Sequence, residues 1–332
     1  MSVKLHEIIL SLTNRCNLRC TMCQIPENGN EEELGTEDVK TLIRDSLKLQ
    51  PQGIVFSGGE PLLRNDIFEL IAFAHSHEIK TCLTSNGTLI DERAARRLSG
   101  AGIDVVNISI EGPESIHDGL RGGGNFKKAM AALSALARYR IETTIATLIC
   151  RQNYVGLPYV LELAHQRRIS TVKFQPFSEI FLKDRDRQKD FFIPEDALTQ
   201  VRRVISKVIL LSKEYEIATN PPDYLLSLSS YLCGSRRRYP RQRCLALWTS
   251  CPISANGDVH LCWVLPDKVL GNIRKNGLSK IWNSDEHNRL RRRPVKQGCG
   301  GCLMSCYDRN FEKRGLGRLA PGYILKRLLK IF

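Results

Sequence analysis

Three cysteines, Cys16, Cys20 and Cys23, stand close together near the start of the chain in a CxxxCxxC spacing. They follow residues 7–12, an apolar and partly β-branched segment typical of a buried strand. Three thiolates in one tight loop can bind three irons of a cubane [4Fe–4S] cluster and leave the fourth iron open to a substrate or cofactor. The alternatives are a zinc site of three cysteines completed by a distant histidine, and buried thiols without a ligand.

A glycine pair and a carboxylate, Gly58-Gly59-Glu60, follow the next strand-like segment, residues 53–57. Two glycines let the backbone approach a ligand closely, because neither carries a side chain. In a parallel α/β fold, chemistry gathers at the carboxyl ends of the strands, where this motif and the cysteine loop both lie. An ordinary strand-to-helix turn is the alternative for a lone Gly-Gly-Glu.

A second group of cysteines lies after residue 232, where seven of the twelve cysteines are found. Cys244 and Cys262 flank an Asn-Gly dipeptide, which strongly favours a hairpin turn. The hairpin brings these two cysteines together, and the later CxxC of Cys299 and Cys302 supplies a second pair of ligands. A Cys₄ zinc ribbon is the structural alternative.

Strand and helix signals alternate over the first two thirds of the chain. The strand-like segments are residues 7–12, 53–57, 80–84, 104–110, 143–149 and 171–175. Helical patterns cover residues 36–47, with Thr36 as the N-cap, and residues 67–77, 92–99, 126–139, 157–166 and 195–215. This alternation predicts an α/β fold with a parallel sheet, either open and doubly wound or a partial barrel.

The composition, 42% hydrophobic and 25% charged, is that of an ordinary globular protein. No apolar run approaches the ~18–20 residues needed to span a bilayer, and strand-like sequence begins at once, which argues against a secreted or multi-span protein. We therefore expect a cytoplasmic protein. Its cysteines then indicate metal or cluster ligation rather than disulfides, because cytosolic thiols stay reduced.

The net charge of +14 resides in the C-terminal part of the chain. Residues 233–332 contain 21 Lys and Arg against 6 Asp and Glu, whereas residues 1–232 contain 28 and 29. This shift places a boundary near residue 230. We expect an α/β domain in residues 1–190, a helix and linker in 191–232, a cysteine-rich domain in 233–310 and a tail in 311–332.

The tail has the pattern of an amphipathic helix. At ~100° per residue, its apolar side chains between residues 324 and 332 cover one face, and Lys326, Arg327 and Lys330 lie opposite. Such a helix favours weak, reversible association with an anionic membrane or an acidic partner. The alternative is a helix folded back onto the barrel.

Together, the CxxxCxxC loop after the first strand and the GGEP turn after the second resemble the signature of the radical S-adenosylmethionine (SAM) superfamily. Residues 84–87, Thr-Ser-Asn-Gly, resemble the end of that family's third strand, and residues 109–122 resemble its fourth-strand segment. The matches cover about residues 7–180, which in that family form a partial (β/α)6 TIM-like barrel.

The resemblance implies roles for the matched residues. Cys16, Cys20 and Cys23 would ligate the cluster, and SAM would chelate the open iron. The SAM contacts would be Gly58, Gly59 and Glu60 at the methionine amino group, with Asn86, Ser109 and Arg121 at the rest of the molecule. The reduced cluster would cleave SAM to methionine and a 5′-deoxyadenosyl radical that takes a hydrogen atom from the substrate. Two positions depart from the family: Met22 replaces a frequent aromatic residue, and Glu111 replaces the usual Asp, which argues against a SAM-ribose contact for Glu111.

The later cysteines resemble the auxiliary-cluster extensions of this superfamily called SPASM and twitch domains. A complete SPASM domain binds two further clusters, and a twitch domain binds one. We expect one auxiliary [4Fe–4S] cluster on Cys244, Cys262, Cys299 and Cys302, with Cys306 as a further candidate ligand. Two clusters are the alternative, although they would need eight thiolates where seven exist, and Cys251 has the setting of a core residue in the hairpin.

The resemblance implies a radical SAM oxidoreductase or tailoring enzyme whose auxiliary cluster accepts an electron from the substrate or ligates it. The expected substrate is a peptide or a small polar biosynthetic intermediate, and the expected partner is a reducing electron donor such as a flavodoxin or ferredoxin. Only about six residues precede the first strand, which disfavours a fused leader-binding module and so weakens the peptide hypothesis.

A different class of function is a non-catalytic iron–sulfur or zinc-ribbon protein that binds an anionic partner through its basic C-terminal region. Nucleic acid is not the expected partner. The sequence alone does not select a catalytic base or the residues that contact the substrate.

Overall fold

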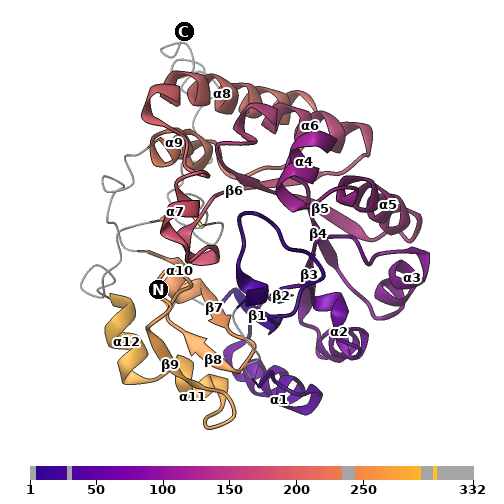
Figure 1. Ribbon diagram of the computed structural model, residues 1–332. Coiled ribbons are helices and arrows are strands. Elements are labelled where there is room, and N and C mark those ends of the chain that lie inside the picture. The colour runs from indigo at the N-terminus through magenta and orange to yellow at the C-terminus, as the bar shows by residue number, and fades with distance from the viewer. Residues whose placement is uncertain (1–4, 28–31, 234–243, 293–301, 305–332) are drawn as a thin grey trace.

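A computed structural model describes residues 5–27, 32–233, 244–292 and 302–304. These residues form one nine-stranded sheet in the order β6-β5-β4-β3-β2-β1-β7-β8-β9 (Figure 1). The strands from β6 to β7 are all parallel, and β8 runs antiparallel to its two neighbours, β7 and β9. The parallel α/β architecture and the C-terminal hairpin predicted from the sequence are therefore confirmed.

The elements follow the predicted alternation. The strands are β1 (Glu7–Thr13), β2 (Gly53–Gly58), β3 (Lys80–Ser85), β4 (Val105–Ser109), β5 (Glu142–Ile149), β6 (Thr171–Pro176), β7 (Ser250–Ile253), β8 (Asp258–His260) and β9 (Val269–Asn272). The helices are α1 (Thr36–Ser46), α2 (Ile67–Ser76), α3 (Glu92–Gly100), α4 (Glu114–Arg121), α5 (Asn125–Arg138), α6 (Leu157–Gln166), α7 (Arg185–Gln188), α8 (Leu198–Glu214), α9 (Pro222–Leu232), α10 (Ala246–Thr249), α11 (Leu278–Trp282) and α12 (Asp285–Arg292).

The two faces of the parallel strands differ. Alternate side chains such as Ile8 and Leu10 of β1 are fully buried in the same apolar core as the helices, which lie outside the strands in Figure 1. The side chains between them, such as Ile9 and Ser11, are only half-buried. These half-buried side chains form the inner face of the partial barrel, a surface that a substrate can reach.

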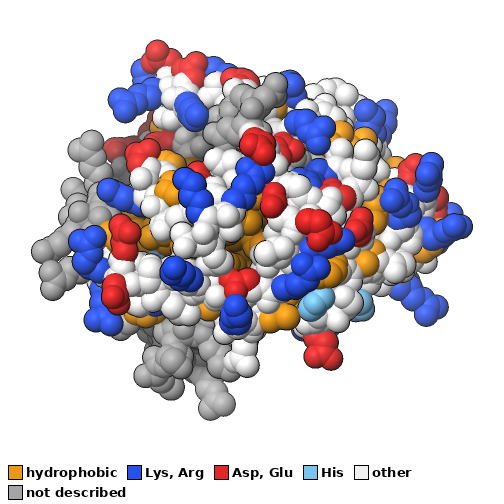
Figure 2. Space-filling model, turned by 90° about the horizontal axis from the view of Figure 1, so that it is seen from below, with side chains coloured by type: hydrophobic (Ala, Val, Ile, Leu, Met, Phe, Trp, Pro, Cys, Tyr) orange, Lys and Arg blue, Asp and Glu red, His pale blue; other side chains and the backbone are white. Residues whose placement is uncertain are grey.

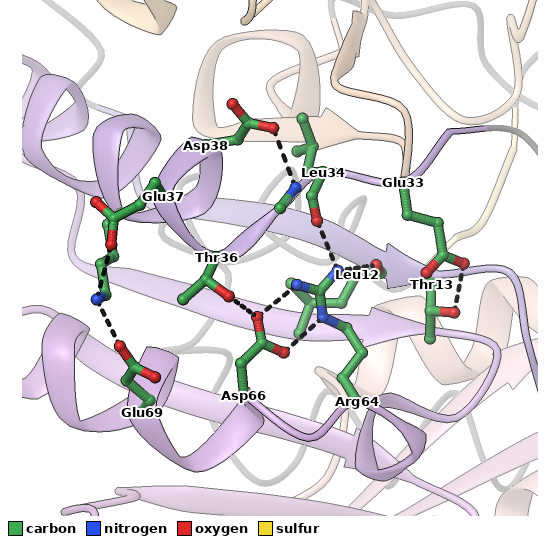
Figure 3. A network of polar contacts seen from close by, with 12 residues as sticks. Leu12, Thr13, Glu33, Leu34, Thr36, Glu37, Asp38, Arg64, Asp66 and Glu69 are labelled. Atoms are coloured by element: carbon green, nitrogen blue, oxygen red, sulfur yellow. Dashed lines mark hydrogen bonds and ion pairs between the residues drawn. The ribbon is translucent and has the colours of Figure 1, made fainter.

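A buried arginine joins the end of β1 to the turn after β2 (Figure 3). The Arg64 guanidinium donates to the carbonyl oxygens of Leu12 and Leu34, at 3.1 and 2.7 Å, and forms a bidentate pair with Asp66. Thr36 donates to the same carboxylate at 2.7 Å. The prediction of Thr36 as the N-cap is wrong: Gly35 occupies that position, and the Thr36 hydroxyl is committed to Asp66.

The C-terminal strands extend the sheet beyond β1. Ser250 pairs with Glu7 at the start of β1, and Gly257, in the left-handed region at φ 91°, turns the chain from β7 into β8. Helix α11 docks on α1, where the Asp45 carboxylate accepts hydrogen bonds from the backbone and hydroxyl of Ser279. Residues 191–232, expected to form a helix and a linker, contain α8 and a further helix, α9, whose Tyr224 is fully buried.

Several predictions lie outside the described residues, namely those for Cys299, Cys306 and the amphipathic tail 311–332. No helix in the part of the chain that the structure describes is long and apolar enough to cross a membrane. On the face shown in Figure 2, Lys and Arg side chains are interspersed with Asp and Glu. That face therefore lacks the continuous basic surface typical of nucleic-acid binding.

Candidate functional site

The cysteine loop lies at the carboxyl end of β1. Cys16, Cys20 and Cys23 are all half-buried, between β1 and the short turn at Ile25–Glu27. Burial raises the pKa of each thiol, to about 11 for Cys23. Each thiolate would also feel its neighbours' negative charge, since Cys20 raises the pKa of both Cys16 and Cys23. The loop without metal therefore holds thiols, and a bound metal would be needed to draw off their protons.

The glycines after β2 pack directly against this loop. The Gly59 amide donates to the carbonyl of Thr13 at 2.7 Å, and the Glu60 amide donates to that of Arg15 at 2.9 Å. A Cβ on Gly59 would lie 2.2 Å from the Arg15 oxygen, and one on Gly58 would lie 2.3 Å from the Thr13 oxygen. Only glycine permits this approach, so the pair positions the cysteine loop.

The Glu60 side chain is fully buried and links the ends of β2 and β3. Its carboxylate accepts hydrogen bonds from the Ser85 hydroxyl and the Asn86 amide, both at 2.9 Å, and from the Leu62 amide at 3.2 Å. Burial raises the pKa of this carboxyl, although these bonds oppose the rise. The side-chain amide of Asn86 donates to the Asn17 side chain at 2.9 Å, and the same Asn86 nitrogen lies 3.9 Å from the Cys16 sulfur. These residues hold the Cys16 side of the loop.

A buried ion pair holds the Cys20 side. Arg121, at the end of α4, donates through Nε to the fully buried Glu111 carboxylate at 2.8 Å, and its Nη1 lies 4.0 Å from the Cys20 sulfur. Burial lowers the pKa of the guanidinium, but the charge and hydrogen bonds of Glu111, together with the charges of Cys20 and Cys23, outweigh this and the pKa is raised. The sequence reasoning placed Arg121 at SAM and missed its pairing with Glu111. The substitution of Glu for Asp at position 111 was the available signal.

The remaining expected SAM contact, Ser109, ends β4 on the inner face of the barrel. It is half-buried, and its hydroxyl makes no hydrogen bond to the described residues. Its register neighbour on β5 is Ala146, which pairs in turn with Lys173 of β6. Ser109 therefore lies beside a surface that sequence reasoning did not identify, because only the strand register brings these residues into one row.

Three expected auxiliary-cluster ligands fall within the described residues. Cys244 and Cys262 both pack against the apolar cluster of Leu247, Leu261 and Leu290. Cys302 is buried in the main core, which Cys244 also touches. Beside it, the Leu303 carbonyl accepts a hydrogen bond from Tyr224 of α9. Among the described residues, no three His, Cys, Asp or Glu side chains are grouped closely enough to hold one metal ion.

Three other cysteines have the surroundings of core residues. Cys251 is fully buried in β7, and burial strongly raises its pKa. Cys150 is also fully buried, with a pKa raised to about 12 by burial. Cys82 lies on the inner face of β3, where burial likewise raises its pKa to about 12 and Asn107 donates to its sulfur. Protonated thiols of this kind are unreactive.

Comparison with known proteins settles the family. A model of the radical SAM superfamily matches residues 10–164, and one of the SPASM iron–sulfur cluster-binding domain matches residues 244–303. The PqqA peptide cyclase of Rhizobium meliloti is 30% identical over 295 residues, 83% of this chain and 72% of the cyclase. The chain belongs to the radical SAM superfamily. It carries a SPASM domain after the radical SAM domain, as predicted.

Other relatives are named for different activities. The AdoMet-dependent heme synthase of Nitratidesulfovibrio vulgaris is 28% identical over 91% of this chain and 88% of that synthase. The Fe-coproporphyrin III synthase of Methanosarcina barkeri is 34% identical, but the match spans 50% of this chain and 43% of that protein. Among solved structures, anSMEcpe with bound AdoMet aligns with a TM-score of 0.69 and 18% identity, covering 98% of this chain and all of that one. That likeness shows the fold.

Iron–sulfur clusters and SAM are thus the cofactors of this radical SAM protein. The cysteine loop supplies the donor set for the first cluster, although its three thiols are not grouped closely enough to hold a single metal ion. Three thiols share one loop, which is the donor set that a site-differentiated cluster needs, and an arginine lies beside one sulfur. The glycine turn holds the loop's backbone with no space for a side chain between them.

Proposed function

We propose that this protein is a SAM-cleaving radical enzyme that oxidises or tailors a peptide or a small polar biosynthetic intermediate. In this proposal Cys16, Cys20 and Cys23 bind the cluster that reduces SAM. Its chemistry is the reductive cleavage of SAM and removal of a hydrogen atom from the substrate by the resulting radical. The observation that carries the proposal is the attachment of one three-cysteine loop to three strand ends at once.

Each attachment has a separate task. The Gly58-Gly59 turn fixes the position of the cysteine loop relative to the sheet through backbone hydrogen bonds. Glu60 and Asn86 position the part of the loop that contains Cys16. Arg121 places a positive charge beside Cys20 and is available to a carboxylate ligand, since Glu111 occupies only part of its donor set. Ser109 lies on the inner face, and its hydroxyl forms no hydrogen bond to the part of the chain that the structure describes.

We propose one auxiliary [4Fe–4S] cluster on Cys244, Cys262, Cys299 and Cys302, with Cys306 as a further candidate ligand. Support comes from the apolar cluster that Cys244 and Cys262 share, while Cys302 is buried in the main core, against which Cys244 also packs. An acidic one-electron carrier such as a flavodoxin or ferredoxin is the proposed reductant.

Two substrate scaffolds are supported by the names of relatives. Heme synthases match this chain over most of both sequences, which favours a tetrapyrrole. A peptide is the second candidate, favoured by the 30% identity to a peptide cyclase and by the similarity to a mycofactocin maturase.

The test of the core proposal is formation of 5′-deoxyadenosine by anaerobically reconstituted, reduced protein supplied with SAM. The triple variant Cys16→Ala, Cys20→Ala, Cys23→Ala should form none, yet keep the iron of the auxiliary site. If the wild type and the triple variant form equal amounts of product, the assignment of the loop is wrong.

A further inference from the structure

A lysine without a counter-ion lies on the inner face of the barrel. Lys173 is the central residue of β6 on that face, and it is half-buried. Its ammonium makes one long contact, 3.5 Å to the carbonyl of Thr219, and forms no ion pair with any described carboxylate. Removing a cation from water without a partner of opposite charge is costly, so an unpaired, half-buried lysine indicates a site for an anion.

The strand register places this lysine near the expected SAM contacts. Ser109 of β4 pairs with Ala146 of β5, and Ala146 pairs with Lys173. Neighbouring strands are ~4.8 Å apart, so the Lys173 backbone lies about 10 Å from that of Ser109 on the same level of the barrel. Ala146 carries only a methyl group, so no large side chain of β5 separates Ser109 from Lys173 in this row.

A second polar group stands beside the lysine. Gln175 lies two residues further along β6, on the same face, and is half-buried; its amide makes no hydrogen bond to the described residues. Its register neighbour is Leu148, whose backbone amide donates to Glu111. That carboxylate is already paired with Arg121, so it does not neutralise Lys173.

We infer that Lys173, with Gln175, binds a carboxylate of the substrate and so holds a carbon atom of that substrate within reach of the SAM site. This inference rests on the proposed function and adds the chemical class of the substrate, an acid. An ammonium and an amide N–H can each donate to a carboxylate oxygen, and the neutral row Ser109–Ala146 beside Lys173 suits an uncharged portion of the substrate. Carboxylates occur on tetrapyrroles and on peptides alike.

The test measures binding to the SAM-loaded holoenzyme, anaerobic and without reductant, so that no turnover occurs. One probe pair is coproporphyrin III and its tetra-amide. The other is a short peptide with two glutamates and the same peptide with two glutamines. In the wild type at least one acid should bind about 10–100-fold more tightly than its amide, the ratio for a charge-assisted hydrogen bond, and the pair that responds identifies the scaffold.

Variants separate the lysine from general electrostatics. Lys173→Met should abolish the preference for the acid, and Lys173→Arg should retain it. Lys80→Met removes a lysine at the amino-terminal end of β3, away from the site, and this variant should also retain the preference for the acid. The inference is overturned if neither acid is preferred by the wild type, if Lys173→Met keeps the preference, or if Lys80→Met loses it equally.

Failure of the proposed function has a different readout. Formation of 5′-deoxyadenosine by the reduced wild type, without any probe, tests SAM cleavage alone. A wild type that makes none but prefers an acid through Lys173 would refute the enzymatic proposal and retain the anion site. A wild type that cleaves SAM but shows no acid preference would support the enzymatic proposal and refute the anion site.

Discussion

Replacement of Gly59 by alanine should remove the cluster of the cysteine loop while leaving the fold intact. The added Cβ would lie 2.2 Å from the Arg15 oxygen, and ordinary contacts begin near 3 Å, so the loop must move by roughly 1 Å. That movement breaks or stretches the hydrogen bonds from Gly59 to Thr13 and from Glu60 to Arg15. Each buried group left without a partner costs about 1–3 kcal/mol, which gives about 2–6 kcal/mol for both.

The assay is iron content per chain after anaerobic reconstitution, together with the thermal midpoint. With one cluster in each domain, Gly59→Ala should retain about four of eight irons and lose SAM cleavage. The matched control is Gly100→Ala at the end of α3, where an added Cβ meets nothing within 4 Å. That change should keep all iron and stabilise the protein by up to about 1 kcal/mol. Full iron and normal cleavage in Gly59→Ala would refute the role of the glycine in positioning the loop.

Four further outcomes are expected. Glu111→Gln leaves a buried guanidinium without its counter-charge and should lower the free energy of unfolding by about 3–5 kcal/mol in urea titrations, against at most about 1 kcal/mol for the exposed Glu114→Gln. Burial lowers the pKa of His117 from 6.5 to about 4. The unfolded chain therefore takes up a proton at this residue more readily, and the free energy of unfolding decreases as the pH falls below 6.5. Between pH 7 and pH 5 the wild type should lose about 2 kcal/mol more of that free energy than His117→Gln. Cys251→Ala should keep the auxiliary iron, and its loss would disprove the proposed ligand set. On the hypothesis that the basic tail associates with anionic membranes, the full chain should co-sediment with anionic liposomes and deletion of residues 313–332 should abolish this; persistence of binding would exclude the tail as the membrane contact.

Local signals in the sequence were sufficient to predict the parallel strands and the loops that follow them. Each of three motifs depends on residues close together in the chain and is therefore recognisable in the sequence. They are the Cys16–Cys23 spacing, the Gly-Gly-Glu turn and the Asn-Gly hairpin. The family and its SPASM domain followed from these motifs.

The contacts that hold the site were not predictable in this way, because they join residues far apart in sequence. Arg64 reaches the carbonyl of Leu12 across 52 positions. The Glu111–Arg121 pair spans a helix that periodicity did not reveal, since α4 is short and begins directly after the turn at Gly112 and Pro113. The position of Lys173 in the same row as Ser109 is known only from the register of β4, β5 and β6. Charge and spacing alone do not specify register.

The pairing of β1 with β7 has a consequence for synthesis of the protein on the ribosome. β1 emerges before its two partners: β2 follows within about fifty residues, but Ser250–Ile253 of β7 comes about 240 residues after β1. At ~5–20 residues per second, one side of β1 therefore stays unpaired for roughly 12–48 s. An unpaired strand edge is a template for pairing with another nascent chain. Ribosome-bound chains that end before residue 250 should accordingly depend on chaperones, whereas chains that include β7 should not.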